Sequence, residues 1–251
     1  METKSLDGRR ILITRPLAEG EETAARIRAA GGVPLLAPVL ELAPPHQPEA
    51  LATALNQLDR YDGLIVTSVN GARALLAALK PGPSRPPIYA VGEKTAAVLR
   101  QAGWQAKLPT QPEDALRLAE TILGEHPDAG HFLFLRAEEG REELPARLRA
   151  TGCQVTLLTA YRMIPTNALP EPVLESLAKQ TIDAVLFFSS RTAEVFLQLL
   201  PPDLPFPGAA VVAALSPKIA ASLASHGIPC PVVAESPNTE ELLQALRNHF
   251  T

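Results

Sequence analysis

The chain has 251 residues, of which 46% are apolar and 20% charged, a composition typical of globular proteins rather than of disordered chains. Its formal net charge of −4 argues against nucleic acid as a partner, because nucleic acids attract basic surfaces. Residues 1–10 do not have the pattern of a secretory signal, and the apolar stretches fall short of the roughly 18 residues of a membrane span. The two cysteines are isolated, which fits a reducing compartment. We therefore expect a cytoplasmic protein.

Short apolar segments alternate along the chain with segments whose apolar residues recur at helical spacing. Strands are predicted, in chain order, at 10–14, 63–67, 88–91, 131–135, 183–188 and 209–214. Helices are predicted at 21–30, 72–79, 93–102, 110–123, 142–150, 192–200, 216–227 and from 238 onward. Asn70 and Ser216 are expected N-caps, and residues 110–113 and 238–241 form capping-box patterns. The alternation predicts an α/β fold in which helices cover both faces of parallel sheets.

The chain contains an internal repeat. The matching segments are 62–68 with 183–189, 92–96 with 216–220 and, more loosely, 10–15 with 132–136. The first pair lies 121 positions apart and the second 124, and unrelated βα segments do not readily give ordered matches at nearly constant spacing. The length also allows two modest domains. Two similar α/β domains with a cleft between them are therefore the simplest architecture.

The sequence lacks the motifs of several common chemistries. It has no glycine-rich nucleotide-binding pattern, no nucleophile elbow and no zinc-protease motif. Its five histidines do not pair at ligand spacing, and each is expected to be a solvated or capping side chain. We therefore expect no metal site and no nucleotide site.

Small hydroxyl-bearing and basic residues follow the predicted strands. They are Thr14, Arg15, Thr67, Ser68, residues 92–95, Arg136, residues 189–191 and residues 216–218. The carboxyl ends of parallel strands share one sheet edge, where ligands bind and where the unpaired amides of helix N-termini favour anions. For any single Thr, Ser or Asn, a plain N-cap explains the residue equally well. Because both copies carry such residues, we predict a binding edge for a carboxylate or phosphate ligand.

Six segments carry a family resemblance. They are GRRILITRP at 8–16, DGLIVTS at 62–68, AVGEKTA at 90–96, LRAEEGRE at 135–142, AYR at 160–162 and AESPNTE at 234–240. In this order they resemble the uroporphyrinogen-III synthase family, essentially from end to end. The resemblance implies two flavodoxin-like α/β domains joined by a two-stranded linker, with the linear tetrapyrrole hydroxymethylbilane in the cleft between them. The implied domains are residues 1–36 plus 165–251 and residues 43–156, with 37–42 and 157–164 as linker strands.

The resemblance implies a hydro-lyase that cyclises hydroxymethylbilane to uroporphyrinogen III without metal or organic cofactor. Loss of the hydroxymethyl hydroxyl gives an azafulvene, and attack by the substituted carbon of the terminal pyrrole gives a spiro intermediate that fragments and recloses with that ring inverted. Tyr161 matches the tyrosine that assists departure of the hydroxyl. The alternative is that Tyr161 has only a packing role, as an aromatic side chain that fills space beside a linker strand.

The resemblance also implies binding residues. Hydroxyl positions that face the cleft are matched by Thr67, Ser68, Thr95 and Ser189. Departures from the family pattern are Ser216 and Ile219, in place of glycine and threonine, and Ser190–Arg191, in place of Pro–Ser. Because Ile219 has no hydroxyl, we expect Lys218 to supply an anion contact. The predicted substrate-binding residues are Thr14, Arg15, Thr67, Ser68, Asn70, Gly92, Lys94, Thr95, Arg136, Arg141, Ser189, Ser190, Ser216 and Lys218.

The expected partner is therefore a small molecule, with no nucleic acid and no membrane. We expect a monomer, and we expect any contact with hydroxymethylbilane synthase to be transient. The competing hypothesis is a non-catalytic two-domain binding or sensor protein for an anionic small molecule on the same fold. The two hypotheses differ in whether the chain turns over hydroxymethylbilane.

Overall fold

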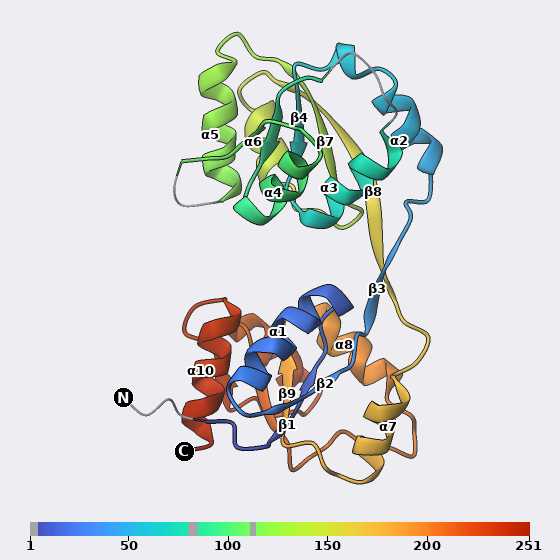
Figure 1. Cartoon of the computed structure of the whole chain (residues 1–251), viewed down its shortest axis with the longest axis vertical. Coiled ribbons are helices and arrows are strands. Elements are labelled where there is room, and N and C mark those ends of the chain that lie inside the picture. Colours follow the sequence, from blue (N-terminus) through green and yellow to red (C-terminus); the bar gives the residue numbers. More distant parts are fainter. Residues whose placement is uncertain (1–4, 80–84, 111–113) are drawn as a thin grey trace. The chain divides into compact units, whose positions relative to one another are not determined.

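The computed structural model describes residues 5–79, 85–110 and 114–251. The chain divides into unit 1, which comprises residues up to Glu41 together with Ile164–Thr251, and unit 2, Leu42–Met163. The chain enters unit 2 within β3 (Leu40–Ala43) and leaves it within β8 (Gln154–Pro165), and these two strands pair (Figure 1). Within the described ranges, no helix combines the length and apolarity that a bilayer crossing requires.

Unit 1 is built on a five-stranded sheet in the order β11-β10-β9-β1-β2, in which neighbours run parallel. The strands are β1 (Arg10–Ile13), β2 (Val33–Leu36), β9 (Ala184–Phe187), β10 (Val211–Ala214) and β11 (Val232–Val233). The helices are α1 (Leu17–Ala29), α7 (Glu171–Ala178), α8 (Ser190–Leu199), α9 (Pro217–Ser225) and α10 (Thr239–His249). Alternate side chains of β1 face α1 and α10, whereas Phe187 packs against Phe196 of α8 with ring centroids 5.8 Å apart. The apolar strands β1 and β9 are therefore covered on both faces, as their composition requires.

Unit 2 is built on a six-stranded sheet in the order β3-β8-β7-β4-β5-β6. Its other strands are β4 (Gly63–Val66), β5 (Ile88–Ala90), β6 (Ala106–Lys107) and β7 (His131–Ala137). Its helices are α2 (Pro48–Leu55), a 3-10 turn η1 (Leu58–Arg60), α3 (Val69–Ala78), α4 (Glu93–Gln101), α5 (Ala115–Glu125) and α6 (Glu143–Arg149). Leu64 and Val66 pack with α2, α3 and α4, whereas Ile65 packs with α5 and α6 on the opposite face of the sheet.

The sequence repeat corresponds to one plan in both sheets. The matched strands β4 and β9 lie at equivalent places, and the aspartate before each strand binds the start of its neighbour. Asp62 Oδ2 accepts a hydrogen bond from the His131 amide at 2.8 Å, and Asp183 Oδ2 accepts one from the Arg10 amide at 2.7 Å. Unit 1 combines β1 and β2 of the first repeat with β9, β10 and β11 of the second, whereas unit 2 holds the remaining strands of both. The expected α/β class with two parallel sheets is confirmed, and the repeats are interleaved between the units.

One predicted helix start in unit 1 is wrong, and the expected linker stretches contain strands. Helix α1 begins at Leu17, before the expected start at 21, because Pro16 occupies the N-cap position. Strand β3 begins within the stretch 37–42, expected as one linker strand. The stretch 157–164, expected as the other linker strand, lies within β8, which pairs with β3 and, as far as Tyr161, with β7.

Two helix starts also differ from the prediction. Asn70 does not cap α3, because Ser68 holds the N-cap position and its Oγ accepts from the Gly71 amide at 3.0 Å. Most of the capping box expected at 110–113 lies outside the described residues. Asp114 is the N-cap of α5, and its carboxylate accepts from the Arg117 amide at 2.8 Å. The N-cap role of Asn238 is confirmed, since its Oδ1 accepts from the Glu241 amide at 2.9 Å.

Candidate functional site

A pocket of about 400 Å³ lies where the strands of unit 2 end. Five predicted residues line it, namely Thr67, Ser68, Arg136, Arg141 and Tyr161. Thr67 and Ser68 follow β4, Arg136 and Arg141 lie at and just after the end of β7, and Tyr161 lies within β8 opposite Ala137 at the end of β7. The parallel sheet thus brings together residues that are far apart in the sequence. The lining residues that the sequence analysis missed include Val91, Asp114, Phe134, Gly140 and Glu143. The pocket thus combines hydroxyl groups, guanidinium groups and an apolar wall.

Tyr161 belongs both to the core of unit 2 and to the lining of this pocket. Its ring belongs to the core that contains Leu133 and Leu135, and the residue is only 9% exposed. Its hydroxyl lies 3.1 Å from Ser68 Oγ, and both residues line the pocket. A packing role and a role in chemistry are therefore compatible, because the ring packs in the core of unit 2 while the hydroxyl meets Ser68 at the pocket wall.

Arg136 organises the loop between β7 and α6. Its Nη1 donates to the Gly140 and Arg141 carbonyls, each at 3.0 Å, and its Nη2 lies 2.5 Å from a Glu142 carboxylate oxygen. With 15% of its side chain exposed, Arg136 is largely committed to these contacts. Arg141, by contrast, is exposed on the same loop and lines the pocket. We therefore expect Arg141 to meet an anionic ligand directly and Arg136 to shape the loop that presents it.

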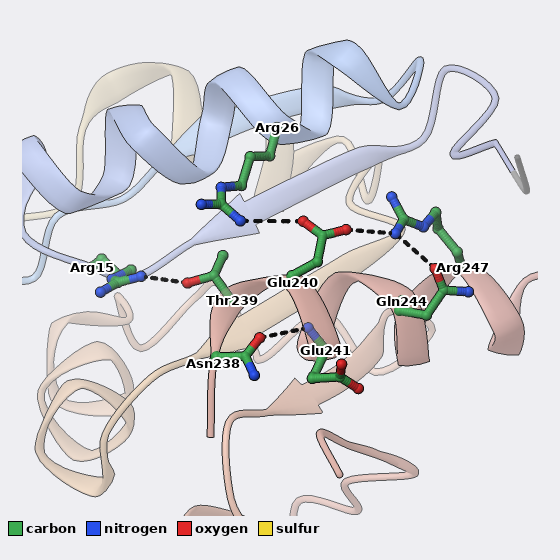
Figure 2. Close-up of polar contacts among 8 residues, drawn as sticks. All are labelled: Arg15, Arg26, Asn238, Thr239, Glu240, Glu241, Gln244 and Arg247. Carbon is green, nitrogen blue, oxygen red and sulfur yellow. Dashed lines mark hydrogen bonds and ion pairs between the residues drawn. The ribbon is translucent and has the colours of Figure 1, made fainter. Parts of the chain in front are cut away.

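At the equivalent strand ends of unit 1, an aromatic ring occupies the space beside the arginine. Arg15 corresponds to Arg136 in the repeat, and its guanidinium lies 4.4 Å from the centroid of the Phe188 ring. Arg15 also donates to Thr239 Oγ1 at 3.0 Å (Figure 2). Burial lowers the Arg15 pKa, while Glu19 and Glu22 oppose that shift. Because Phe188 stands where unit 2 has Thr67, the repeat yields an open pocket at one position and a packed cation–ring pair at the other.

Charged side chains join α1 to α10 in unit 1. Glu240 accepts from Arg26 at 3.2 Å and from Arg247 at 3.0 Å, and Arg247 also donates to Gln244 at 2.8 Å (Figure 2). These contacts, led by the Arg247 hydrogen bond, lower the Glu240 pKa. The cluster stabilises the packing of α1 against α10, which together cover the face of the sheet where Ile11 and Ile13 of β1 point.

Replacing Glu240 with glutamine is expected to lower the midpoint of thermal unfolding near neutral pH by about 2 °C. The lowered pKa means that the carboxylate stabilises the folded state above its unfolded pKa of about 4.3, and that this contribution is lost as the pH falls toward the folded value. Unfolding of both proteins at about pH 7 and about pH 3 measures the difference. A difference that stays the same at both pH values would contradict the role of the charge.

The other predicted residues of unit 2 lie at helix starts. Gly92 is the N-cap of α4 with an extended φ of −136°, so its backbone conformation does not require glycine. Lys94 is exposed in the first turn of α4, whereas Thr95 is buried there. Asn70 lies in the first turn of α3 and is half-buried.

Among the predicted residues of unit 1, Thr14 is a buried contact between strands, whereas the serines and Lys218 lie at helix starts. Thr14 is fully buried, and its hydroxyl donates to the Leu186 carbonyl at 2.9 Å, so it holds β1 to β9 rather than facing a ligand. Ser189 is the N-cap of α8 in a capping box with Thr192, and Ser190 is the first residue of that helix. Ser216 is the N-cap of α9 without a side-chain cap bond, and Lys218 is exposed in the first turn.

The described residues hold no group of three or more His, Cys, Asp or Glu that could bind a metal ion. The fold and the site together define a class: a two-unit α/β protein whose strand ends present hydroxyl, amide and guanidinium groups suited to an anionic small molecule. A family model described as uroporphyrinogen-III synthase HemD matches residues 21–244. The chain belongs to the uroporphyrinogen-III synthase family, which makes it a hydro-lyase of porphyrin biosynthesis.

Individual relatives agree with this assignment. The chain is 33% identical over 213 residues to uroporphyrinogen-III synthase of Synechococcus elongatus, covering 81% of this chain and 79% of the relative. It is 31% identical over 161 residues to the Escherichia coli uroporphyrinogen-III synthase, covering 61% and 64% respectively. Among solved structures, uroporphyrinogen-III synthetase from Helicobacter pylori matches with a TM-score of 0.64 at 21% identity, over 97% of this chain and 100% of the other. A mutant uroporphyrinogen III synthase from Thermus thermophilus matches with a TM-score of 0.54 at 23% identity, over 97% and 99%. The structural likenesses show the shared two-domain α/β fold.

Proposed function

We propose that this chain cyclises hydroxymethylbilane to uroporphyrinogen III, and that the pocket of unit 2 holds the end of the substrate that loses its hydroxyl. The observation that carries this assignment is the Tyr161 hydroxyl at the wall of a pocket that also presents Thr67, Ser68 and Arg141. A proton donor beside cationic and hydroxyl groups suits a substrate that bears carboxylates and must release water.

In this mechanism Tyr161 acts as a general acid. Its phenol gives a proton to the departing hydroxyl oxygen, the carbon–oxygen bond breaks, and water leaves as the azafulvene forms. Attack by the substituted carbon of the terminal pyrrole gives the spiro intermediate, which fragments and recloses with the ring inverted. The proton that the terminal pyrrole finally loses restores the phenol, so the net change is loss of one water. The pocket contributes by holding the reacting ends in one geometry, because the free substrate also closes spontaneously to the other isomer, uroporphyrinogen I.

Replacing Arg141 with alanine is expected to raise KM about 10-fold with a smaller change in kcat, because a charge-assisted contact is worth roughly 1.5–3 kcal/mol. Lys218→Ala should act in the same direction, since Lys218 is exposed in the first turn of α9. Arg136→Ala should also lower the midpoint of thermal unfolding, because it removes the contacts that hold the loop. Steady-state kinetics and thermal unfolding of the three variants test these expectations. Unchanged kinetics for Arg141→Ala and Lys218→Ala would assign both to the solvated surface.

The decisive experiment is incubation of the chain with freshly generated hydroxymethylbilane, followed by chromatographic separation of the two product isomers. Uroporphyrinogen III is the expected product. Formation of isomer I alone, at the spontaneous rate, would contradict the proposed activity. Sedimentation of the same sample tests the expected monomer, and cell fractionation tests the expected cytoplasmic location, both of which rest on the family assignment and the sequence.

A further inference from the structure

Ser68 occupies an unusual place among the helix caps of this protein. Its Oγ accepts from the Gly71 amide at 3.0 Å, as an N-cap should, and it also lies 3.1 Å from the Tyr161 hydroxyl. A serine hydroxyl has one proton to donate and two lone pairs. With one lone pair used by the helix, the proton is available to Tyr161.

The repeat explains why that proton is available. Ser189, the counterpart of Ser68 in unit 1, donates its hydroxyl proton to Thr192 Oγ1 at 3.1 Å and also accepts from the Thr192 amide at 3.0 Å. The residue equivalent to Thr192 in unit 2 is Gly71, which has no hydroxyl to take the proton. The cap hydroxyl of unit 1 thus bonds within its own capping box, whereas the cap hydroxyl of unit 2 lies against the Tyr161 hydroxyl.

We propose that Ser68 is a positioning residue for Tyr161, an inference that rests on the proposed function. Ser68 donates its hydroxyl proton to Tyr161 Oη, so the phenol proton points away from Ser68 and toward the pocket. When Tyr161 gives its proton to the departing hydroxyl, the Ser68 O–H stabilises the phenolate oxygen. The Gly71 amide, at the positive end of the ten-residue helix α3, polarises that O–H in turn.

Kinetics of Ser68 variants test this proposal. Ser68→Ala is expected to lower kcat about 10-fold and to change KM less than about two-fold. A loss of this size in kcat is what the removal of one hydrogen bond from the transition state should cause. Ser68→Thr keeps the hydroxyl and should recover most of the kcat. In the Tyr161→Phe background, Ser68→Ala should have little further effect, because the two residues act as a unit.

Two further variants separate positioning from helix capping. Asn238→Ala removes a matched N-cap, on α10, that has no tyrosine partner, and it should lower the midpoint of thermal unfolding without changing kcat. Gly71→Thr copies the unit 1 capping box, keeps the cap of α3 and diverts the Ser68 proton, so it should lower kcat as Ser68→Ala does. The added Cβ would lie 3.1 Å from Ser68 Oγ, and unfolding measurements must therefore accompany it.

The outcomes distinguish this proposal from the proposed function. A raised KM with unchanged kcat in Ser68→Ala would make Ser68 a plain substrate-binding residue and would overturn the positioning role. Failure of Ser68→Thr to recover activity in a folded protein would also count against it. If Tyr161→Phe left the rate unchanged, the acid role of Tyr161 would fail whatever the Ser68 variants do. If Tyr161→Phe is slow and Ser68→Ala is not, only the positioning role fails.

Discussion

Replacing Tyr161 with phenylalanine is expected to lower the rate of uroporphyrinogen III formation by roughly 10²-fold, the lower end of the effect of losing a general acid, while the product remains isomer III. The ring keeps its packing against the core, because phenylalanine differs from tyrosine only in the lost hydroxyl. The azafulvene forms readily without assistance, so we expect selection of the isomer to depend on how the pocket and the main-chain amides hold the substrate. Rate and isomer ratio, measured on the folded variant, test this directly.

Tyr61→Phe is the matched control for that experiment. Tyr61 precedes β4 and packs against the His131 ring with centroids 4.7 Å apart, and it does not line the pocket. Its replacement should leave the rate unchanged. Complete loss of turnover in a folded Tyr161→Phe protein would show that tyrosine chemistry, rather than the geometry of the bound substrate, is the dominant factor. An unchanged rate would show that Tyr161 is not the acid.

Replacing Thr67 with phenylalanine is expected to raise KM at least about 10-fold and to increase the share of isomer I. In unit 1 the equivalent Phe188 ring packs against Arg15, and the same ring in unit 2 should fill the pocket beside Arg136. The fold should accept the change, because the repeat already carries phenylalanine at this position. Substrate released before closure reacts in solution, which is why isomer I should increase.

Thr67→Val separates the effect of filling the pocket from the effect of losing the hydroxyl, since valine has nearly the shape of threonine. It should alter KM much less than Thr67→Phe does. Isomer ratios, KM and thermal unfolding of both variants complete the comparison. A folded Thr67→Phe protein that makes isomer III at the original rate would mean that the substrate does not occupy this pocket.

The sequence alone predicted the central strands because each is a run of apolar residues, typical of strands buried on both faces. It missed α2 and α7, which are eight residues long and begin in proline-rich segments, so they carry little periodic signal. The two-residue strands β6 and β11 carry none at all. Local composition was enough to predict that a helix or strand exists. It was not enough to predict where a helix begins, because two candidate N-caps can lie within a few residues of each other, as Ser68 and Asn70 do.

Strand-end reasoning found the candidate site but not its internal contacts. It selected Ser68, whereas Tyr161 came from the family resemblance, and neither indicated their hydrogen bond, which joins residues 93 positions apart and depends on the pairing of strands. It also treated Arg15 and Arg136 alike. Comparing the repeat at Thr67 and Phe188 would have revealed the difference, because a threonine leaves space beside the guanidinium that a phenylalanine occupies.

The interleaving of the two repeats has a consequence for biosynthesis on the ribosome. Strand β1 emerges early, but the amide of Arg10 bonds to Asp183, which is 173 positions later. At about 5–20 residues per second, β1 waits on the order of ten seconds or more for β9, its central neighbour. Unit 2 is contiguous and completes its sheet during that interval. The newly made chain therefore carries an apolar strand with an unpaired edge, and translation is the stage at which it is most open to association with other chains.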